Sequence, residues 1–202
     1  MGCVSNRIWW CIVAVLGVRL NSAFQYAAYL HQEQRRKLTD TPYLAHLMAV
    51  SAMVIENGGD EDTAIAALLH DAIEDQGGDS TRQEILRYFG PRVVSIIDEV
   101  TETDKMPKPP WRERKETYLK HLGKASPEAA LVALADKVHN AKSTLNDYFS
   151  IGNDVWLRFN AGKEEQQWWY YELVKTFKKI ESLPNSLVNE LDIVVRELFL
   201  KF

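Results

Sequence analysis

The feature that most constrains the fold of this chain is the spacing of its apolar residues. They recur at three- and four-residue intervals, and no stretch of β-branched residues alternates with polar ones. Within residues 20–37, for example, Phe24, Ala27 and His31 fall on one face of a helix. A chain of 202 residues, 46% of them hydrophobic, suits one domain with a buried core. The pattern therefore predicts an all-α fold, a helical bundle in a single domain.

Capping residues indicate where some of these helices begin. One helix is expected to begin after the N-cap Asp60 and to continue through Asp75. Thr81 and Glu84 have the spacing of a capping box, which predicts a helix start at that point. Ser126, with a proline directly after it, predicts another.

Charge and cysteine content exclude several classes of protein. Lys and Arg number 24 against 28 Asp and Glu, giving a net charge of −4, so a protein that binds nucleic acid without regard to sequence is not expected. A local basic cluster can still hold a phosphorylated small molecule. Cys3 and Cys11 both precede residue 12, so the rest of the chain has no disulfide framework. A reducing compartment follows, and we expect a cytoplasmic protein.

Residues 1–18 are expected to be an apolar extension to a domain formed by residues 19–202. The apolar run at residues 8–18 has eleven residues, too few for a membrane-spanning helix, which takes about 20. Four interpretations are open: a misassigned start codon, an additional packed helix, a targeting signal and a lipid anchor. We favour the first two, so no membrane partner is expected.

Titratable side chains follow directly on an apolar run at residues 64–69. They are His70, Asp71, Glu74 and Asp75. Because a helix turns about 100° per residue, the four side chains lie on two adjacent stripes. Burying such groups is costly unless a charge meets them, and a divalent metal such as Mn²⁺, Fe²⁺ or Zn²⁺ suits imidazole and carboxylate ligands. The alternative is an amphipathic helix that has reached the solvent.

Two further positions complete a set of metal ligands. His46 follows a proline-tyrosine pair, and Asp136 follows a second apolar run at residues 129–135. Taken singly, a buried histidine is more often part of a core, and such an aspartate is more often an internal cap. Together with the histidine and aspartate at positions 70 and 71, they form a two-His, two-Asp set with coordination positions left for water and substrate. Asn140 lies one turn beyond Asp136 and is expected to face the same cavity.

A basic cluster at the end of the first predicted helix includes Arg36 and Lys37. Such cations can complement the helix dipole and remain in solvent. They can equally form a phosphate clamp, because arginine binds phosphate with two hydrogen bonds and lysine adds a point charge. Lys105, Lys108, Arg112, Arg114 and Lys115 form a second cationic stretch. We favour a solvated helix face for that stretch over a lid that contributes charge to phosphates.

Five short sequence motifs, in this order, resemble those of the hydrolase domain of the RelA/SpoT alarmone enzymes. These enzymes are a branch of the HD superfamily of metal-dependent phosphohydrolases. The resemblance covers residues 22–148 and is closest to stand-alone hydrolases, both metazoan and bacterial. The motifs are HQEQRRK, TPYxxH, ALLHDxxED, YFG…VxxxxxEVT and LADKxHN.

The resemblance implies a bundle of about ten helices and removal of pyrophosphate from the 3′ position of ppGpp or pppGpp, yielding GDP or GTP. It also assigns roles to residues of this chain. Glu74 and Asp75 take the place of the catalytic acidic pair, which positions or deprotonates water. One divalent ion, Mn²⁺, is expected to bind to His46, His70, Asp71 and Asp136. The residues expected to bind the nucleotide are Arg36, Lys37, Asn140 and Lys142.

Three functions stay open on the sequence. The leading one is a Mn²⁺-dependent, hydrolase-only alarmone pyrophosphohydrolase, since about 50 residues after Tyr148 are too few for a second catalytic domain. The second is an HD phosphohydrolase for another nucleotide, such as NADPH or a nucleoside monophosphate, because Lys142 stands where the family usually has arginine. The third is a helical module that binds a nucleotide or a partner without turnover. A homodimer is possible in each case, and the aromatic cluster around Trp169 is expected to be core or a subunit contact.

Overall fold

The computed structural model describes residues 16–37, 39–103 and 107–200. Most of the predicted N-terminal extension, residues 1–18, lies outside these ranges, and so does Lys105. Among the described residues, the regular structure consists of ten α-helices and one 3₁₀ helix, which confirms the all-α prediction. The helices are α1 (Val18–Leu30), α2 (Leu44–Glu56), α3 (Glu61–Leu69), α4 (Ala72–Asp75), α5 (Asp79–Phe89), α6 (Pro91–Val100), α7 (Trp111–Leu122), α8 (Pro127–Ile151), η1 (Gly152–Arg158), α9 (Lys163–Phe177) and α10 (Asn185–Leu200).

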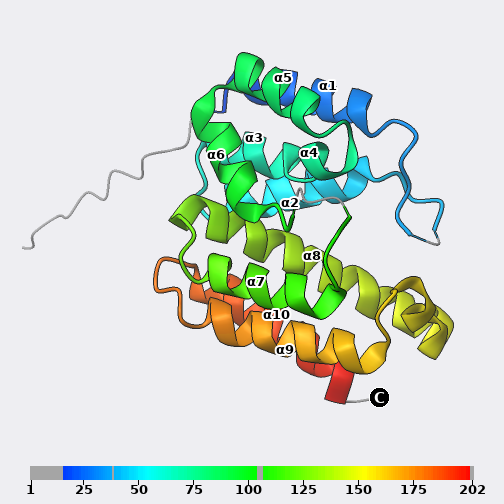
Figure 1. The fold of residues 1–202 in the computed structure, drawn as a ribbon. Coiled ribbons are helices and arrows are strands. Elements are labelled where there is room, and N and C mark those ends of the chain that lie inside the picture. Colours follow the sequence, from blue (N-terminus) through cyan, green and yellow to red (C-terminus); the bar gives the residue numbers. More distant parts are fainter. Residues whose placement is uncertain (1–15, 38, 104–106, 201–202) are drawn as a thin grey trace, which may run out of the picture.

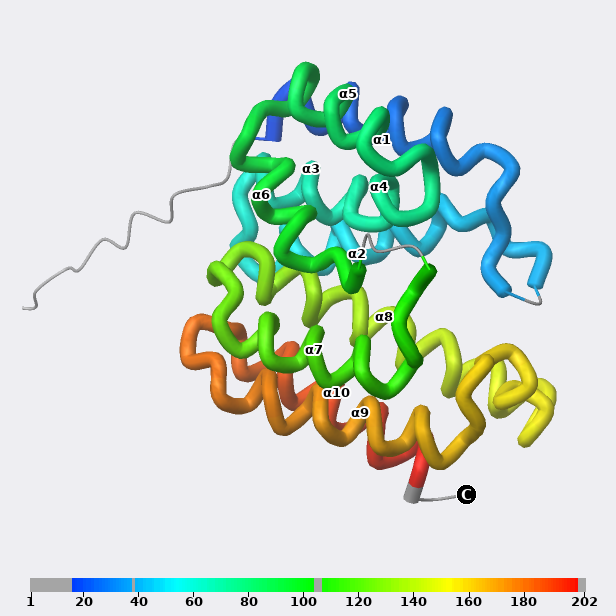
Figure 2. Tube along the Cα trace, in the orientation of Figure 1, coloured from blue at the N-terminus to red at the C-terminus, as the bar shows by residue number. Residues whose placement is uncertain are grey.

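The long helix α8 runs through the middle of the bundle (Figure 1). Helices α1 to α6 lie on one side of it and α7, α9 and α10 on the other, as the tube in Figure 2 shows. Helix α3 packs against α1, α2 and α6, while α8 packs against α2, α6 and α10. None of the described helices is long and apolar enough to cross a membrane.

Small residues bring the central helices close together. The predicted apolar runs at residues 64–69 and 129–135 are buried throughout, and both are rich in alanine. Close approach of α3 and α8 to their neighbours is possible because alanine side chains add little bulk. Larger side chains fill the spaces that remain. The largest fully buried ones include Leu47, Ile65, Leu134, Leu173 and Leu191. The buried side chains His46, His70 and Asp136 therefore lie next to this apolar core.

The first helix is shorter than the prediction for residues 20–37. It ends at Leu30, and the chain then forms turns that lead to an isolated antiparallel bridge between Arg35 and Pro42. Backbone hydrogen bonds close this loop, from Arg36 N to Thr41 O and from Tyr43 N to Gln34 O. Helical periodicity alone does not show such pairing, because it depends on contacts made by the next segment. The loop brings the basic cluster beside the start of α2.

The helix expected to run from Asp60 through Asp75 is divided in two. Helix α3 ends at Leu69 and α4 begins at Ala72. At the break, His70 Nδ1 lies 2.8 Å from the carbonyl oxygen of Ala67, the acceptor that an unbroken helix offers to a backbone amide one turn later. The start of α3 is as predicted, since the Asp60 carboxylate accepts a hydrogen bond from Thr63 N.

The predicted capping box at Thr81 and Glu84 is wrong. Helix α5 begins earlier, at Asp79, after Gly78, whose φ of 59° suits glycine. Thr81 donates instead to the carbonyl oxygen of Gln76, and Glu84 accepts from the hydroxyl of Tyr26. Tertiary contacts have replaced the local cap. The Ser126 cap is confirmed, because its hydroxyl accepts from Ala129 N.

Candidate metal centre and active site

Four side chains from distant parts of the chain meet at the centre of the bundle. His46 comes from α2, His70 and Asp71 from the break between α3 and α4, and Asp136 from α8. The Nε2 atom of His46 lies 3.2 Å from Asp136 Oδ1 and 3.8 Å from Asp71 Oδ2. The Nε2 atom of His70 lies 3.1 Å from Asp71 Oδ2 and 3.7 Å from Asp136 Oδ1. Two nitrogens and two carboxylate oxygens therefore face one point.

The donor set at this point fits a divalent cation. His46, His70 and Asp136 are buried, and each offers a ligand atom within 4.8 Å of those of the others. The two Nε2 atoms are buried and face carboxylate oxygens of Asp136 and Asp71, and burying these carboxylates is costly unless a positive charge balances them. Imidazole nitrogen and carboxylate oxygen together suit first-row divalent metals. These atoms therefore have the chemistry and the spacing of a metal site.

The charges at the site support the same interpretation. Burial alone would lower the pKa of His70, yet the carboxylates of Asp71 and Asp136 raise that pKa well above its usual value. A protonated His70 thus balances two neighbouring anions while no cation is bound. A divalent ion would take over this role and leave His70 neutral, which is the form that binds metal.

Contacts with residues outside this set orient the candidate ligands, and three of them involve the two histidines and Asp71. His70 Nδ1 bonds the Ala67 carbonyl oxygen at 2.8 Å, which leaves Nε2 to face the site. His46 Nδ1 lies 2.8 Å from Nδ1 of His139, and the Tyr43 hydroxyl donates to Asp71 Oδ2 at 2.5 Å. Such contacts set the tautomer and direction of metal ligands.

No role for His139 or Tyr43 was predicted from the sequence, although both lie within the motifs that carry the family resemblance. Burial and the positive charges of His46 and Arg36 lower the pKa of His139 to about 4. His139 is therefore neutral near pH 7 and can accept the Nδ1 proton of His46. A signal for it was present, since it lies one turn of helix from Asp136 on α8.

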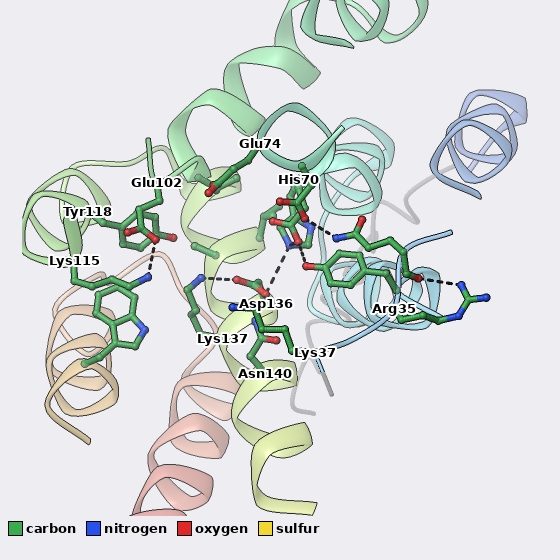
Figure 3. Close-up of a pocket in the computed structure, with 18 residues that line it drawn as sticks. Arg35, Lys37, His70, Glu74, Glu102, Lys115, Tyr118, Asp136, Lys137 and Asn140 are labelled. Atoms are coloured by element: carbon green, nitrogen blue, oxygen red, sulfur yellow. Dashed lines mark hydrogen bonds and ion pairs between the residues drawn. The ribbon is translucent and has the colours of Figure 1, made fainter. Parts of the chain in front are cut away.

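Glu74 and Asp75, the predicted acidic pair, lie on α4 and line a cavity of about 460 Å³ together with His70, Asp71 and Asp136 (Figure 3). Glu74 accepts a hydrogen bond from the Lys108 ammonium at 2.7 Å. Asp75 Oδ2 accepts one from Gln34 Nε2 at 2.8 Å. Burial and the charge of Asp71 raise the pKa of Asp75.

Gln34 connects Asp75 to a buried histidine. The Oε1 atom of Gln34 lies 2.6 Å from His31 Nδ1 and also accepts from Gln76 Nε2 at 2.8 Å. His31 is buried and stacks on Tyr43 with ring centroids 5.6 Å apart. The amide of Gln34 is thus held on its oxygen side, and its nitrogen points at Asp75.

The residues predicted to bind a nucleotide divide into two groups. Lys37 and Asn140 line the cavity, and the guanidinium of Arg36 donates to Asn140 Oδ1 at 3.0 Å. Lys142 is not part of the cavity lining, because its ammonium is turned to α10, where it pairs with Glu190. Arg36 is not in the cavity lining either, but it contacts Asn140, which is, whereas Lys142 pairs with Glu190 away from the cavity.

The second cationic stretch is only partly a solvated face. Arg112 is exposed and pairs with Glu116 and with Glu165, as that interpretation predicts. Arg114 and Lys115 are instead largely covered, and both donate to the carboxylate of Glu102, at 2.8 and 2.6 Å. The favoured interpretation is thus wrong for these two side chains.

The HD domain family model matches residues 23–162, so the chain belongs to the HD domain family. Among curated relatives, the guanosine-3′,5′-bis(diphosphate) 3′-pyrophosphohydrolase MESH1 of Xenopus tropicalis is 37% identical over 164 residues, covering 80% of this chain and 86% of the relative. The MESH1 protein of Mus musculus is 38% identical over 127 residues, covering 61% of this chain and 68% of the relative.

A solved structure has the same fold over nearly the whole chain. It is described as a metazoan orthologue of SpoT that hydrolyses ppGpp and plays a role in starvation responses. It matches with a TM-score of 0.74 and 28% sequence identity, and the match covers 93% of this chain and 99% of that one. Together with the curated relatives, it confirms the resemblance to the RelA/SpoT type of hydrolase.

Proposed function

We propose that this chain is a metal-dependent hydrolase that removes pyrophosphate from the 3′ position of ppGpp and pppGpp, giving GDP and GTP. The observation that carries the proposal is the convergence of two imidazoles and two carboxylates on one point, beside a second acidic pair and several cations. The relatives named as ppGpp 3′-pyrophosphohydrolases support the choice of substrate.

One divalent ion, which we propose to be Mn²⁺, would be held by His46, His70, Asp71 and Asp136. When bound, such an ion acts as a Lewis acid towards phosphate and lowers the pKa of a bound water towards neutrality. Mixed imidazole and carboxylate ligands suit Mn²⁺, and they suit Fe²⁺ and Zn²⁺ as well.

Asp75 and Glu74 deprotonate and position the attacking water. Gln34 binds Oδ2 of Asp75, so Oδ1 is the atom that accepts the proton of the water. The raised pKa of Asp75 makes it a stronger base than an ordinary aspartate. Glu74 orients the same water from the neighbouring position on α4. The water oxygen bonds to the phosphorus attached to O3′, the P–O3′ bond breaks, and O3′ takes up the proton that Asp75 received from the water.

Arg36, Lys37 and Asn140 bind the nucleotide on one side of the metal site. Lys37 supplies a charge at the cavity wall, and the bond from Arg36 to Asn140 holds both polar groups in a fixed relation. The same bond joins the basic loop to α8, so the nucleotide side of the cavity is organised before substrate arrives.

The proposal is tested with a panel of substrates in the presence of Mn²⁺. Pyrophosphate released from ppGpp and pppGpp, with little product from NADPH or nucleoside monophosphates, is the expected result. Orthophosphate from NADPH or a nucleoside monophosphate would assign the site to another nucleotide. Binding of ppGpp without turnover, by protein that contains no divalent metal, would indicate a non-catalytic module. The domain limits 19–202, the homodimer and the cytoplasmic location stay predictions.

A further inference from the structure

We propose that the cavity has a separate subsite for the terminal phosphate of the 3′ diphosphate, formed by Lys115 and Lys137. We call the region that contains it the distal lobe, and its lining residues are Glu102, Lys115, Tyr118, Lys137 and Trp169. The proposal rests on the proposed function and extends it, because it explains how a diphosphate is distinguished from a monophosphate.

The distal lobe lies across the metal site from the residues that bind the nucleotide. In Figure 3, Lys37 lies on one side of Asp136, and Lys137 and the Glu102–Lys115 pair lie on the other. A phosphorus atom at the metal site therefore has the nucleoside on the Lys37 side. A second phosphate attached to that phosphorus has room on the side of Lys137.

The charge of the lobe favours an anion. The carboxylate of Glu102 accepts hydrogen bonds from both Arg114 and Lys115, so these three groups carry one net positive charge. The Lys137 ammonium bonds Asp136 Oδ2 at 2.5 Å. When Asp136 shares its charge with a cation, Lys137 keeps two further N–H donors for a phosphate oxygen.

Aromatic rings hold both ammonium groups in place. Lys115 Nζ lies 4.5 Å from the centroid of the Trp169 ring, and Lys137 Nζ lies 5.4 Å from that of Tyr118. Both rings are buried, which limits the rotamers available to the lysines. Trp169, predicted to be core or a subunit contact, is buried in the core and also forms a wall of this lobe.

Two cations in one covered space repel each other. Burial lowers the pKa of Lys115 and the charge of Lys137 lowers it further, in opposition to Glu102. A phosphate between the two ammonium groups would relieve both the repulsion and the loss of solvation. Orthophosphate has no second phosphate to place in the lobe, whereas pyrophosphate has one.

Direct binding of inorganic anions tests the subsite without relying on turnover. Isothermal titration of the Mn²⁺-loaded chain with pyrophosphate and with orthophosphate is expected to give at least a tenfold preference for pyrophosphate. Lys137→Met and Lys115→Met should each weaken pyrophosphate binding by tenfold or more and change orthophosphate binding by less than twofold. Lys175→Met is the matched control, because Lys175 is an exposed lysine of α9 that pairs with Glu172.

Glu102→Gln gives an effect of opposite sign and removes no lysine. It raises the charge of the lobe by one, so pyrophosphate should bind several-fold more tightly. Melting temperatures and bound metal are measured for every variant, and if a methionine variant does not fold, the glutamine variant decides. Two results would overturn the subsite: equal weakening of pyrophosphate and orthophosphate binding in the lysine variants, or no tighter binding of pyrophosphate by Glu102→Gln.

Two further measurements separate this inference from the proposed function. The affinity for GDP should not change in the lysine variants, and a loss of GDP affinity would assign the lobe to the 5′ diphosphate and refute the proposal. Failure of the wild-type chain to hydrolyse ppGpp, with its pyrophosphate preference intact, would count against the proposed function alone. Hydrolysis of ppGpp without that preference would count against the subsite alone.

Discussion

Replacing Gln34 with leucine tests the role of Asp75 as a base. Gln34 is the residue whose amide nitrogen donates to Asp75 Oδ2, at 2.8 Å, while its oxygen contacts His31 and Gln76. Leucine has a similar size and no donor. A hydrogen bond to a carboxylate stabilises the ionised form, so its loss raises the pKa of Asp75.

The expected size of the change in the pKa of Asp75 depends on how exposed its hydrogen bond to Gln34 is. Hydrogen bonds to charged groups contribute about 1.5–3 kcal/mol, and Asp75 is exposed, so solvent screening reduces this contribution to about 1 kcal/mol. This corresponds to about a fivefold change in the ionisation equilibrium of Asp75. A base acts only when ionised, so the acid limb of the profile of kcat against pH should move to higher pH. Below the limb, kcat should fall about fivefold.

The assay is kcat for ppGpp hydrolysis measured across the acid limb. Gln76→Leu is the matched control, because it removes a contact to Gln34 and keeps the bond from Gln34 to Asp75. It should leave the limb in place. An unchanged limb in Gln34→Leu, in protein that melts cooperatively, would refute the assignment of Asp75 as the base.

Three other variants examine separate parts of the account. Asp60→Ala removes the cap of α3 and should lower the free energy of unfolding in urea by about 1 kcal/mol, whereas Asp60→Asn, which keeps an acceptor for Thr63 N, should lower it less. His139→Leu removes the partner of His46 Nδ1 and should weaken metal binding about 10–100-fold in a competition titration; equal affinities would contradict that role. Lys142→Met should leave kcat/KM for ppGpp within twofold of wild type, and a larger loss would return Lys142 to the site.

The fold was largely predictable because the helices of this chain carry their own signals. Apolar periodicity indicated each long helix, and caps such as Asp60 and Ser126 marked two starts correctly. The end of α1 at Leu30 was not predictable, because the loop after it is held by Tyr43 and by the side chain of Gln34. Local patterns do not report partners that are distant in the sequence.

The residues of the site likewise divide into those with a local sequence signal and those positioned by distant contacts. The candidate metal ligands at positions 70, 71 and 136 could be selected from the sequence because they follow directly on apolar runs. The direction of Lys142 depends on Glu190 of α10, which no spacing rule connects to it. Lys115 and Lys137 come from different helices, α7 and α8, and only the packing of those helices brings both to one cavity.

The most direct test of the account is the divalent metal content of three purified proteins after dialysis against Mn²⁺ and removal of unbound ions. We expect one ion per chain in the wild type and in Glu74→Gln, which loses turnover only. Asp136→Asn should hold none, because the pair of imidazoles loses one of its two carboxylates. Metal content that is the same in all three proteins, or lost equally in both variants, would contradict the convergence of His46, His70, Asp71 and Asp136 on a single cation.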